Sequence, residues 1–389
     1  MRARTPSLFD RSRAFLDAYT HGLKREDLQR LFTRDTREAY RFFARNIDEE
    51  SLRGLSWHRR WLTRARLFFW AFTLRLSPAR RLLYGVALLL CLYGFIQLSQ
   101  GFRGVGSLFV GFLLINLLVL LEVTDRLSLK NDLEIAREIQ YAMLPQAKYE
   151  SPTFEAFGLT RPANTVGGDF YDVLPLPDGR VVVTIGDVAG KGSPAALLMA
   201  LLLAMFRTLV DEGLEAAALA ERLNVQVCRH SPASRFITLF FAACDPVTGR
   251  LVYINAGHMP ALLRRRDGAF EHLRGGGVAL GMFDHSKYEA HEALMAPGDT
   301  LVLYSDGVTE AEDHQGQPFE ESGLEAVVEA HAGASPTELA RTILRVVEAH
   351  AQETYLADDL TVLVVARKTG PPDVPPRPTD HSPASPCAN

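Results

Sequence analysis

The longest apolar stretches of this chain lie in its first third. Residues 82–102 contain no charged side chain, and after Arg103 residues 104–121 are again uncharged. A helix needs about 20 apolar residues to cross a bilayer. A buried helical hairpin of a soluble domain is the alternative, but such helices normally keep one polar stripe, which both runs lack. The pattern therefore predicts a helical transmembrane hairpin over 82–122.

Positive charge is concentrated on one side of the predicted hairpin. Arginines crowd toward the first apolar run: Arg53, Arg59, Arg60, Arg64, Arg66, Arg75, Arg80 and Arg81. Arg126 and Lys130 follow the second run, whereas the connecting turn carries only Arg103. Cytoplasmic flanks of membrane spans are enriched in Lys and Arg. We therefore expect a multi-pass protein of the inner (cytoplasmic) membrane with both ends in the cytoplasm.

Helical patterns flank the hairpin. Residues 67–76 are too short to span and contain Arg75, which favours a helix at the membrane interface. After the hairpin, residues 123–146 are rich in helix formers, and a seam recurs at alternating steps of four and three: Leu129, Leu133, Ala136, Gln140 and Met143. This spacing predicts a coiled-coil-like linker helix that ends at Pro145 and pairs two copies of the chain. A surface helix packed on its own domain is the alternative.

From about residue 154 onward the pattern becomes short β-branched runs separated by turns. Strands are predicted at 181–188, 236–245, 251–257, 300–306 and 360–366. Helices are predicted at 193–211, 214–229, 321–330 and 336–352. Because strands follow one another through short turns, sheets flanked by helices fit better than a strictly alternating fold.

These patterns divide the chain into five parts. Residues 1–81 form a basic helical N-terminal region, 82–122 the hairpin, 123–146 the linker helix and 147–368 a mixed α/β domain. Residues 369–389 are rich in Pro and poor in apolar side chains, which predicts a disordered tail. The 389-residue chain has a formal net charge of −4, so its overall charge gives no case for nucleic acid as a partner. Its four cysteines show no metal-ligand or disulfide spacing.

The candidate chemistry of the α/β domain is carried by acids at the ends of predicted strands. Asp169 lies in GGDFYD, Asp187 follows VVVTIG, Asp306 follows TLVLYS, and Asp358 and Asp359 precede the last strand. If these strands are neighbours in one sheet, the carboxylates meet at one rim and offer only oxygen ligands, which suits Mg or Mn. A lone acid in a turn is usually solvated, so the prediction rests on the whole set.

Five segments of the chain follow the motif order of one known family. GGDFYD, IGDVAGKG, YINAGHMP, LYSDGVTEA and ADDLTVLV resemble the motifs of the SpoIIE-like branch of the metal-dependent (PPM, type 2C) serine/threonine phosphatases, over residues 136–367. The resemblance implies an α/β fold, an αββα sandwich, with two Mn²⁺ or Mg²⁺ ions at one end. It also implies hydrolysis of phosphoserine or phosphothreonine on a signalling protein, with a STAS-type anti-sigma-factor antagonist as the expected substrate.

The resemblance assigns roles to individual residues. Asp187 would bridge both ions and Val188 would give its backbone carbonyl, while Asp169, Asp306 and Asp358 would complete the coordination. Asp187 and Asp169 are the expected catalytic residues, because a water shared by two divalent ions attacks phosphorus. Asp358 matches the family's metal position, so its neighbour Asp359 is the less favoured ligand.

Two nearby residues have competing interpretations. The segment GDVAGKG suggests a phosphate-binding loop, but it lacks four residues between the glycines and has Gly192 where a Ser or Thr should follow Lys191. Lys191 is therefore either a contact to the substrate phosphate or an exposed loop lysine. His258, in NAGHMP, is interpreted as a structural hydrogen-bonding residue and is left off the metal list.

The end of the linker helix also resembles a regulatory element. Residues 136–145 (AREIQYAMLP) are similar to the helix before this domain in regulated members, where its position orders the helix after IGDVAGKG and completes the metal site. Gln140 and Leu144 are the expected regulatory residues. Because this helix joins the second span, the membrane module is expected to set activity, through a homodimer. A catalytically inactive signalling scaffold and a two-metal hydrolase of a small phosphoester remain alternatives.

Overall fold

The computed structural model describes residues 57–98, 104–145, 148–232, 235–351 and 357–369. The chain divides into two compact units, Met1–Leu127 and Ser128–Asn389. The predictions for residues 1–56 and for the Pro-rich tail from residue 370 lie outside the described residues.

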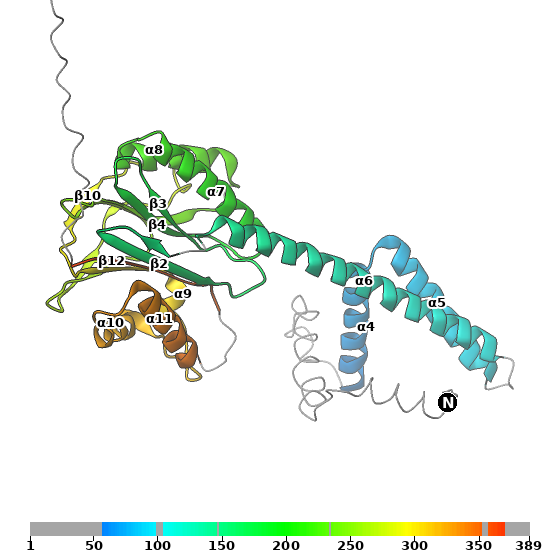
Figure 1. The fold of residues 1–389 in the computed structure, drawn as a ribbon. Helices are drawn as coiled ribbons and strands as arrows, with labels where there is room; N and C mark the ends of the chain where they lie inside the picture. The colour runs from blue at the N-terminus through cyan, green and yellow to red at the C-terminus, as the bar shows by residue number, and fades with distance from the viewer. Residues whose placement is uncertain (1–56, 99–103, 146–147, 233–234, 352–356, 370–389) are drawn as a thin grey trace, which may run out of the picture. The chain divides into compact units, whose positions relative to one another are not determined.

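The described part of the first unit is helical (Figure 1). It contains α4 (Trp57–Arg75), α5 (Pro78–Leu98) and the first half of α6 (Val105–Met143). α5 and α6 approach closely at small residues, since a Cβ on Gly111 would lie 2.5 Å from Cys91 Sγ. Such residues are typical of packed membrane helices. At the other end of the pair, Arg80 forms ion pairs with Glu122 (3.2 Å) and Asp125 (2.7 Å).

The apolar side chains of these helices are largely exposed. Those with high exposure include Leu82, Leu89, Leu92, Phe95, Phe109, Phe112 and Leu120. By length and composition, α5, α6 and α7 (Ser193–Asp211) could each cross a membrane. α7, however, buries one face in the second unit. The candidate spans outside that unit are therefore α5 and the first half of α6.

The helix ends differ from the predicted ranges. α5 starts at Pro78, ahead of the first uncharged run, and the predicted interfacial segment 67–76 forms the end of α4. α6 joins the second uncharged run and the linker in a single helix of 39 residues. The sequence of α6 contains no proline, and Pro145 follows its end.

Two sheets form the centre of the second unit. Sheet A has the order β1 (Tyr149–Glu150), β2 (Phe154–Arg161), β12 (Leu360–Arg367), β11 (Thr300–Tyr304), β7 (Ala261–Arg264) and β8 (Phe270–Leu273). Sheet B has the order β10 (His291–Leu294), β6 (Arg250–Ala256), β5 (Ile237–Cys244), β4 (Val181–Val188) and β3 (Phe170–Pro175), with β9 (Gly276–Gly277) parallel to β6. Neighbouring strands along both paths are antiparallel, as the short connections predict.

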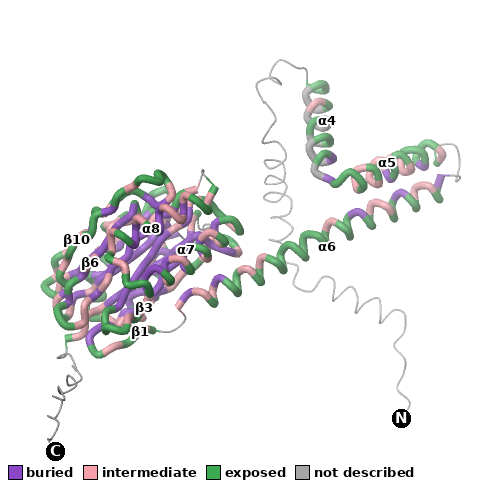
Figure 2. Tube along the Cα trace, turned by 90° about the horizontal axis from the view of Figure 1, so that it is seen from above, coloured by how far each residue is buried: buried purple, intermediate pink, exposed green. Residues whose placement is uncertain are grey.

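Helices cover the outer face of each sheet (Figure 1). α7 and α8 (Ala216–His230) pack on sheet B, whereas α10 (Glu320–Ala330) and α11 (Pro336–His350) lie on the side of sheet A. One apolar core fills the space between the sheets and beneath α7, and another lies under α10 and α11. Figure 2 shows buried residues concentrated inside these layers. The predicted αββα sandwich is confirmed.

Alternation along the strands explains the two cores. On β11, Leu301 and Leu303 face sheet B, whereas Val302 and Tyr304 face α10 and α11, as the two-residue period of a strand requires. β4 and α7 match the predicted ranges, and the other predicted strands and helices end within two residues of the observed bounds. The sequence patterns did not predict β2, β3, β7, β8 or β10.

Candidate metal centre

The predicted acids come from both sheets. Asp169 precedes β3 and Asp187 is the penultimate residue of β4, so both belong to sheet B. Asp306 is the first residue of the short helix α9 (Asp306–Thr309), directly after β11, and Asp358 precedes β12, so these belong to sheet A. The acid-bearing strands are therefore not all neighbours in one sheet, so that condition for bringing the acids together is not met. The acids approach one another because the two sheets face each other.

Asp169 and Asp187 form the buried part of the site. Asp169 is 3% exposed, and its Oδ2 has no hydrogen-bond partner among the described residues. Burial, followed by the charges of Asp187 and Asp359, raises the pKa of Asp169 well above its usual range. Burial, followed by the charge of Asp306, raises the pKa of Asp187 to about 7. Both shifts mean that the anionic forms lack compensating positive charge.

Asp306 and Asp358 form the more exposed part of the site. Burial and the charge of Asp358 raise the pKa of Asp306. Lys191 Nζ lies 3.0 Å from Asp358 Oδ2 and also donates to the carbonyl of Ala357. The ion pair raises the pKa of Lys191. Lys191 therefore projects from the loop after β4 across to the acids of sheet A.

Asp359 has a different environment from its neighbour Asp358. Asp359 Oδ1 accepts a hydrogen bond from the backbone N–H of Ala163 (2.8 Å), and Oδ2 accepts one from Gly168 (2.7 Å). Its own carbonyl accepts from the buried Ser305 hydroxyl at 3.1 Å. Asp359 thus holds the loop before Asp169 in place. From the sequence, Asp359 is predicted only as the less favoured ligand. Two adjacent acids give no signal that one of them holds the loop before Asp169.

Gly168 lies tightly against the acids of sheet B. A Cβ on Gly168 would lie 2.9 Å from both Asp187 Oδ1 and the carbonyl oxygen of Val188. A carboxylate, a backbone carbonyl and the unpaired Asp169 Oδ2 are all hard oxygen donors, which fit Mg²⁺ or Mn²⁺. Within the described ranges, no three Asp, Glu, His or Cys side chains stand close enough together to hold one ion.

A second polar chain supports Asp187 from sheet B. Thr238 pairs with Asp187 in the β4–β5 register, and its hydroxyl lies 3.4 Å from the Asp187 carbonyl oxygen. The same hydroxyl lies 2.9 Å from His258 Nδ1. Burial lowers the pKa of His258 to about 4, so this histidine is neutral at pH 7. His258 thus has a hydrogen-bonding position behind the acids.

The end of α6 contacts the loop that carries Asp169. Gln140 is buried and makes two hydrogen bonds to Gly167: its Nε2 donates to the carbonyl (2.8 Å), and its Oε1 accepts from the N–H (3.2 Å). Leu144 is buried in the core between the sheets and α7. Arg207 of α7 donates to the carbonyl of Met143 (2.6 Å) and pairs with the buried Asp172 (2.7 Å). The linker helix is thus tied to both β3 and α7.

Known proteins share sequence with this chain. The sequence pattern of the family described as "Stage II sporulation protein E (SpoIIE)" matches residues 177–368. The "Phosphoserine phosphatase RsbU" of Bacillus subtilis is 30% identical over 242 residues, which are 62% of this chain and 71% of RsbU. The chain belongs to the SpoIIE family.

Two further comparisons cover the second unit. The "Phosphoserine phosphatase RsbP" of Bacillus subtilis is 24% identical over 246 residues, covering 62% of this chain and 59% of RsbP. The solved structure "SiaA-PP2C domain of Pseudomonas aeruginosa" has a TM-score of 0.55 at 24% identity, covering 62% of this chain and 97% of that domain. The second unit therefore has the PP2C fold, and this SpoIIE-family chain is a protein serine/threonine phosphatase. The predicted family, fold and enzyme class are confirmed.

Proposed function

We propose that this chain is a membrane-anchored phosphatase that hydrolyses phosphoserine or phosphothreonine on a signalling protein, using two divalent ions, Mn²⁺ or Mg²⁺. Asp169, Asp187, the Val188 carbonyl, Asp306 and Asp358 would hold these ions. The observation that carries the proposal is the buried Asp169–Asp187 pair, whose pKa values are raised by burial and by neighbouring negative charge. Cations bound there would remove that penalty.

The protein groups have separable tasks in this reaction. Bound divalent ions supply a nucleophilic water at neutral pH and neutralise charge on the phosphate. Asp187 and Asp169 fix the positions of the ions from sheet B, while Asp306 and Asp358 do so from sheet A. Lys191, which pairs with Asp358 at 3.0 Å, would exchange that carboxylate for the substrate phosphate. Each task follows from where the side chain starts in the fold.

The membrane anchor of the proposal consists of α5 and the first half of α6. Their apolar side chains are exposed, and the small residues at their contact suit packing in lipid. The excess of Lys and Arg on one side of the two spans supports a cytoplasmic position for the phosphatase unit. After cell lysis, the full chain should stay in the membrane pellet through alkaline carbonate washing. Release into the supernatant would contradict the anchor.

The proposed substrate is a phosphorylated STAS-type regulator. Support comes from RsbU and RsbP, both described as phosphoserine phosphatases. We further propose that α6 regulates the site through Gln140 and Leu144, in a homodimer paired along the linker, because Gln140 bonds to Gly167 two residues before Asp169.

The full chain in detergent, supplied with Mn²⁺, tests the proposed reaction. It should release phosphate from phosphoserine proteins, and Asp306→Asn should lower kcat/KM by at least a hundredfold. Asp178→Asn is the matched control, because Asp178 is an exposed acid in the turn between β3 and β4. Equal rates for wild type and Asp306→Asn would refute the metal assignment. Preferential hydrolysis of nucleotides would favour the small-phosphoester alternative, and no turnover of any substrate would favour the scaffold.

A further inference from the structure

Three large apolar side chains are exposed together on one loop region of sheet B. Met282 and Phe283, on the loop between β9 and β10, are 48% and 54% exposed. Phe236, directly before β5, is 39% exposed. The two segments are adjacent because Ile237 and Leu280 form a backbone bridge, and a Cβ on Gly281 would lie 3.7 Å from Phe236 Cα. We call Phe236, Met282 and Phe283 the docking platform.

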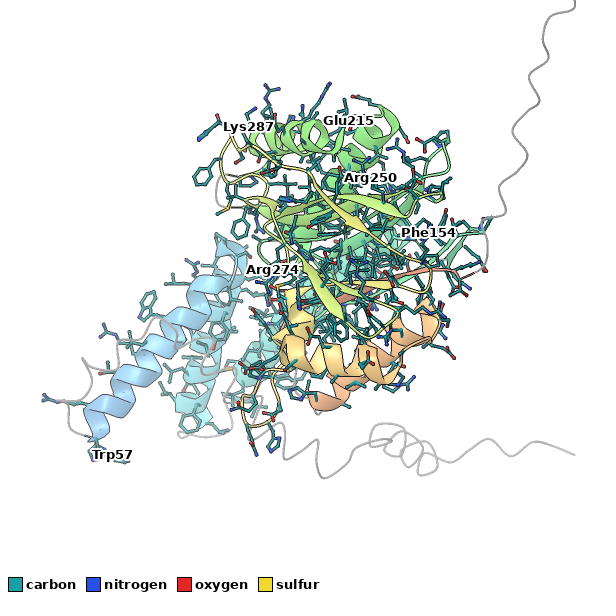
Figure 3. All side chains as sticks on the ribbon, turned by 90° about the vertical axis from the view of Figure 1, so that its left-hand side faces the viewer. Trp57, Phe154, Glu215, Arg250, Arg274 and Lys287 are labelled. Atoms are coloured by element: carbon teal, nitrogen blue, oxygen red, sulfur yellow. The ribbon has the colours of Figure 1, made fainter. Side chains whose placement is uncertain are left out.

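The backbone beneath the docking platform is held rigidly. Asn224 of α8 is fully buried, and its side chain donates to the carbonyl of Phe283 (2.8 Å) and accepts from the N–H of Gly281 (2.8 Å). Next along the loop, Lys287 points outward and pairs with Glu221 of α8 at 3.0 Å (Figure 3). A loop fixed at both ends presents Met282 and Phe283 with little backbone entropy left to lose on binding.

The docking platform is continuous with the metal centre. The carbonyl of Phe236 accepts a hydrogen bond from the N–H of Ala189 at 2.9 Å, and Arg235 Nη1 donates to the carbonyl of Ala189 at 2.9 Å. Ala189 directly follows Val188, whose carbonyl oxygen is one of the two oxygens nearest to a Cβ on Gly168. The backbone of Phe236 is therefore hydrogen-bonded to the residue that follows the candidate metal-binding carbonyl.

We propose that the docking platform binds apolar side chains flanking the phosphoserine of the protein substrate, an inference that rests on the proposed function. Exposed aromatic and Met side chains on a rigid support are typical of binding surfaces. Arg235 beside the platform adds positive charge toward an anionic phosphoprotein. The platform is assigned to the substrate because its backbone is hydrogen-bonded to Ala189, two residues after Asp187.

The test compares two synthetic phosphoserine peptides on the full chain with Mn²⁺, one with Leu and Val on both sides of the phosphoserine and one with Ser and Gly. Wild type should prefer the apolar peptide by at least tenfold in kcat/KM, equal to about 1.4 kcal/mol. Met282→Ser with Phe283→Ser should reduce the preference below threefold. Val247→Ser is the matched control, because Val247 is 65% exposed in the β5–β6 turn, beyond the other end of β5.

Each outcome decides the proposal. A wild type without preference, or a double variant that keeps it, overturns the docking platform. A double variant that changes the sedimentation of the chain but keeps the preference makes the platform a contact between copies, which also overturns the proposal. p-Nitrophenyl phosphate separates the two levels of inference. If wild type hydrolyses it but ignores the flanks, only the platform fails; if wild type hydrolyses none of the three compounds, the proposed function itself fails.

Discussion

Two neighbouring regions of the metal centre use buried aspartates in opposite ways. Asp359, which we call the loop anchor, accepts hydrogen bonds from the backbone N–H groups of Ala163 and Gly168. Asp169, which forms the acid pair with Asp187, is buried to a similar extent. Its Oδ2, however, accepts no hydrogen bond from the described residues. Backbone donors stabilise the Asp359 carboxylate within the protein, whereas burial and the charges of Asp187 and Asp359 disfavour the anionic form of Asp169 more than its contacts to Ser305 and Thr361 favour it. In the proposed site, Asp359 would therefore shape the loop, and Asp169 and Asp187 would supply the affinity for metal.

The largest expected effect separates the two regions by chemistry. Asp187→Asn should lower Mn²⁺-dependent kcat/KM by about a thousandfold, equal to about 4 kcal/mol, because an amide cannot balance two cations. It should leave the metal-free fold intact, since it removes a carboxylate whose charge is disfavoured by burial. Phosphate release and thermal melting, each with and without Mn²⁺, measure both properties. If Asp187→Asn loses activity only because it unfolds, the proposed difference between Asp187 and Asp359 is wrong.

Asp359→Ala should act on stability in the presence or absence of metal. It leaves the N–H groups of Ala163 and Gly168 without their acceptor, which should lower the free energy of unfolding by on the order of 3 kcal/mol. Urea unfolding of the full chain, followed by far-UV circular dichroism, measures this free energy of unfolding. Asp359→Asn, which keeps one acceptor, should lose less. If Mn²⁺ restores Asp359→Ala fully, then Asp359 belongs with the metal ligands instead.

Gln140 contacts the same loop as Asp359, through hydrogen bonds to Gly167. Gln140→Ala should lower kcat/KM by about tenfold, because two hydrogen bonds to a buried backbone segment are lost, while Glu138→Ala on the exposed side of the same turn should have little effect. Raising Mn²⁺ should partly rescue Gln140→Ala if loop order limits metal binding. Rates unchanged in both variants would remove Gln140 from regulation.

The smallest expected effect is the pH dependence of metal-free stability. Because the folded pKa of Asp187 is raised to about 7, the folded state binds a proton more tightly than the unfolded state does. This contribution is fully present below the unfolded pKa of about 4 and is lost as pH rises through about 7. The melting temperature should thus fall from pH 5 to pH 8 more in wild type than in Asp187→Asn. Saturating Mn²⁺ should flatten the wild-type curve.

The sequence predicted those elements whose apolar character is continuous. β4 is apolar on both faces and α7 is apolar over five turns, so their ranges follow from hydrophobicity alone. β3 and β8 mix polar and apolar residues at partly covered positions, and only long-range pairing makes them strands. Motif order selected the candidate acids but did not indicate that they come from two sheets, because strand order depends on contacts far apart in the sequence.

Differences between adjacent residues were also beyond the sequence. Asp358 and Asp359 are the same residue type next to each other, but only the fold brings Ala163 and Gly168 to one of them and Lys191 to the other. Similarly, the linker pattern placed Gln140 on a seam, whereas its partner Gly167 lies 27 residues away. Motif recognition therefore selected the candidate residues, and tertiary contacts distinguished their environments.

The second glycine of GGDFYD has one further consequence. Gly168 shows no left-handed backbone that would demand glycine, yet a methyl group there would sit 2.9 Å from Asp187 Oδ1 and from the Val188 carbonyl oxygen. The methyl group of an alanine would therefore clash with these oxygens and force the loop to shift. The missing side chain at Gly168 therefore lets the loop backbone lie close to two oxygens that would hold a cation in the proposed site.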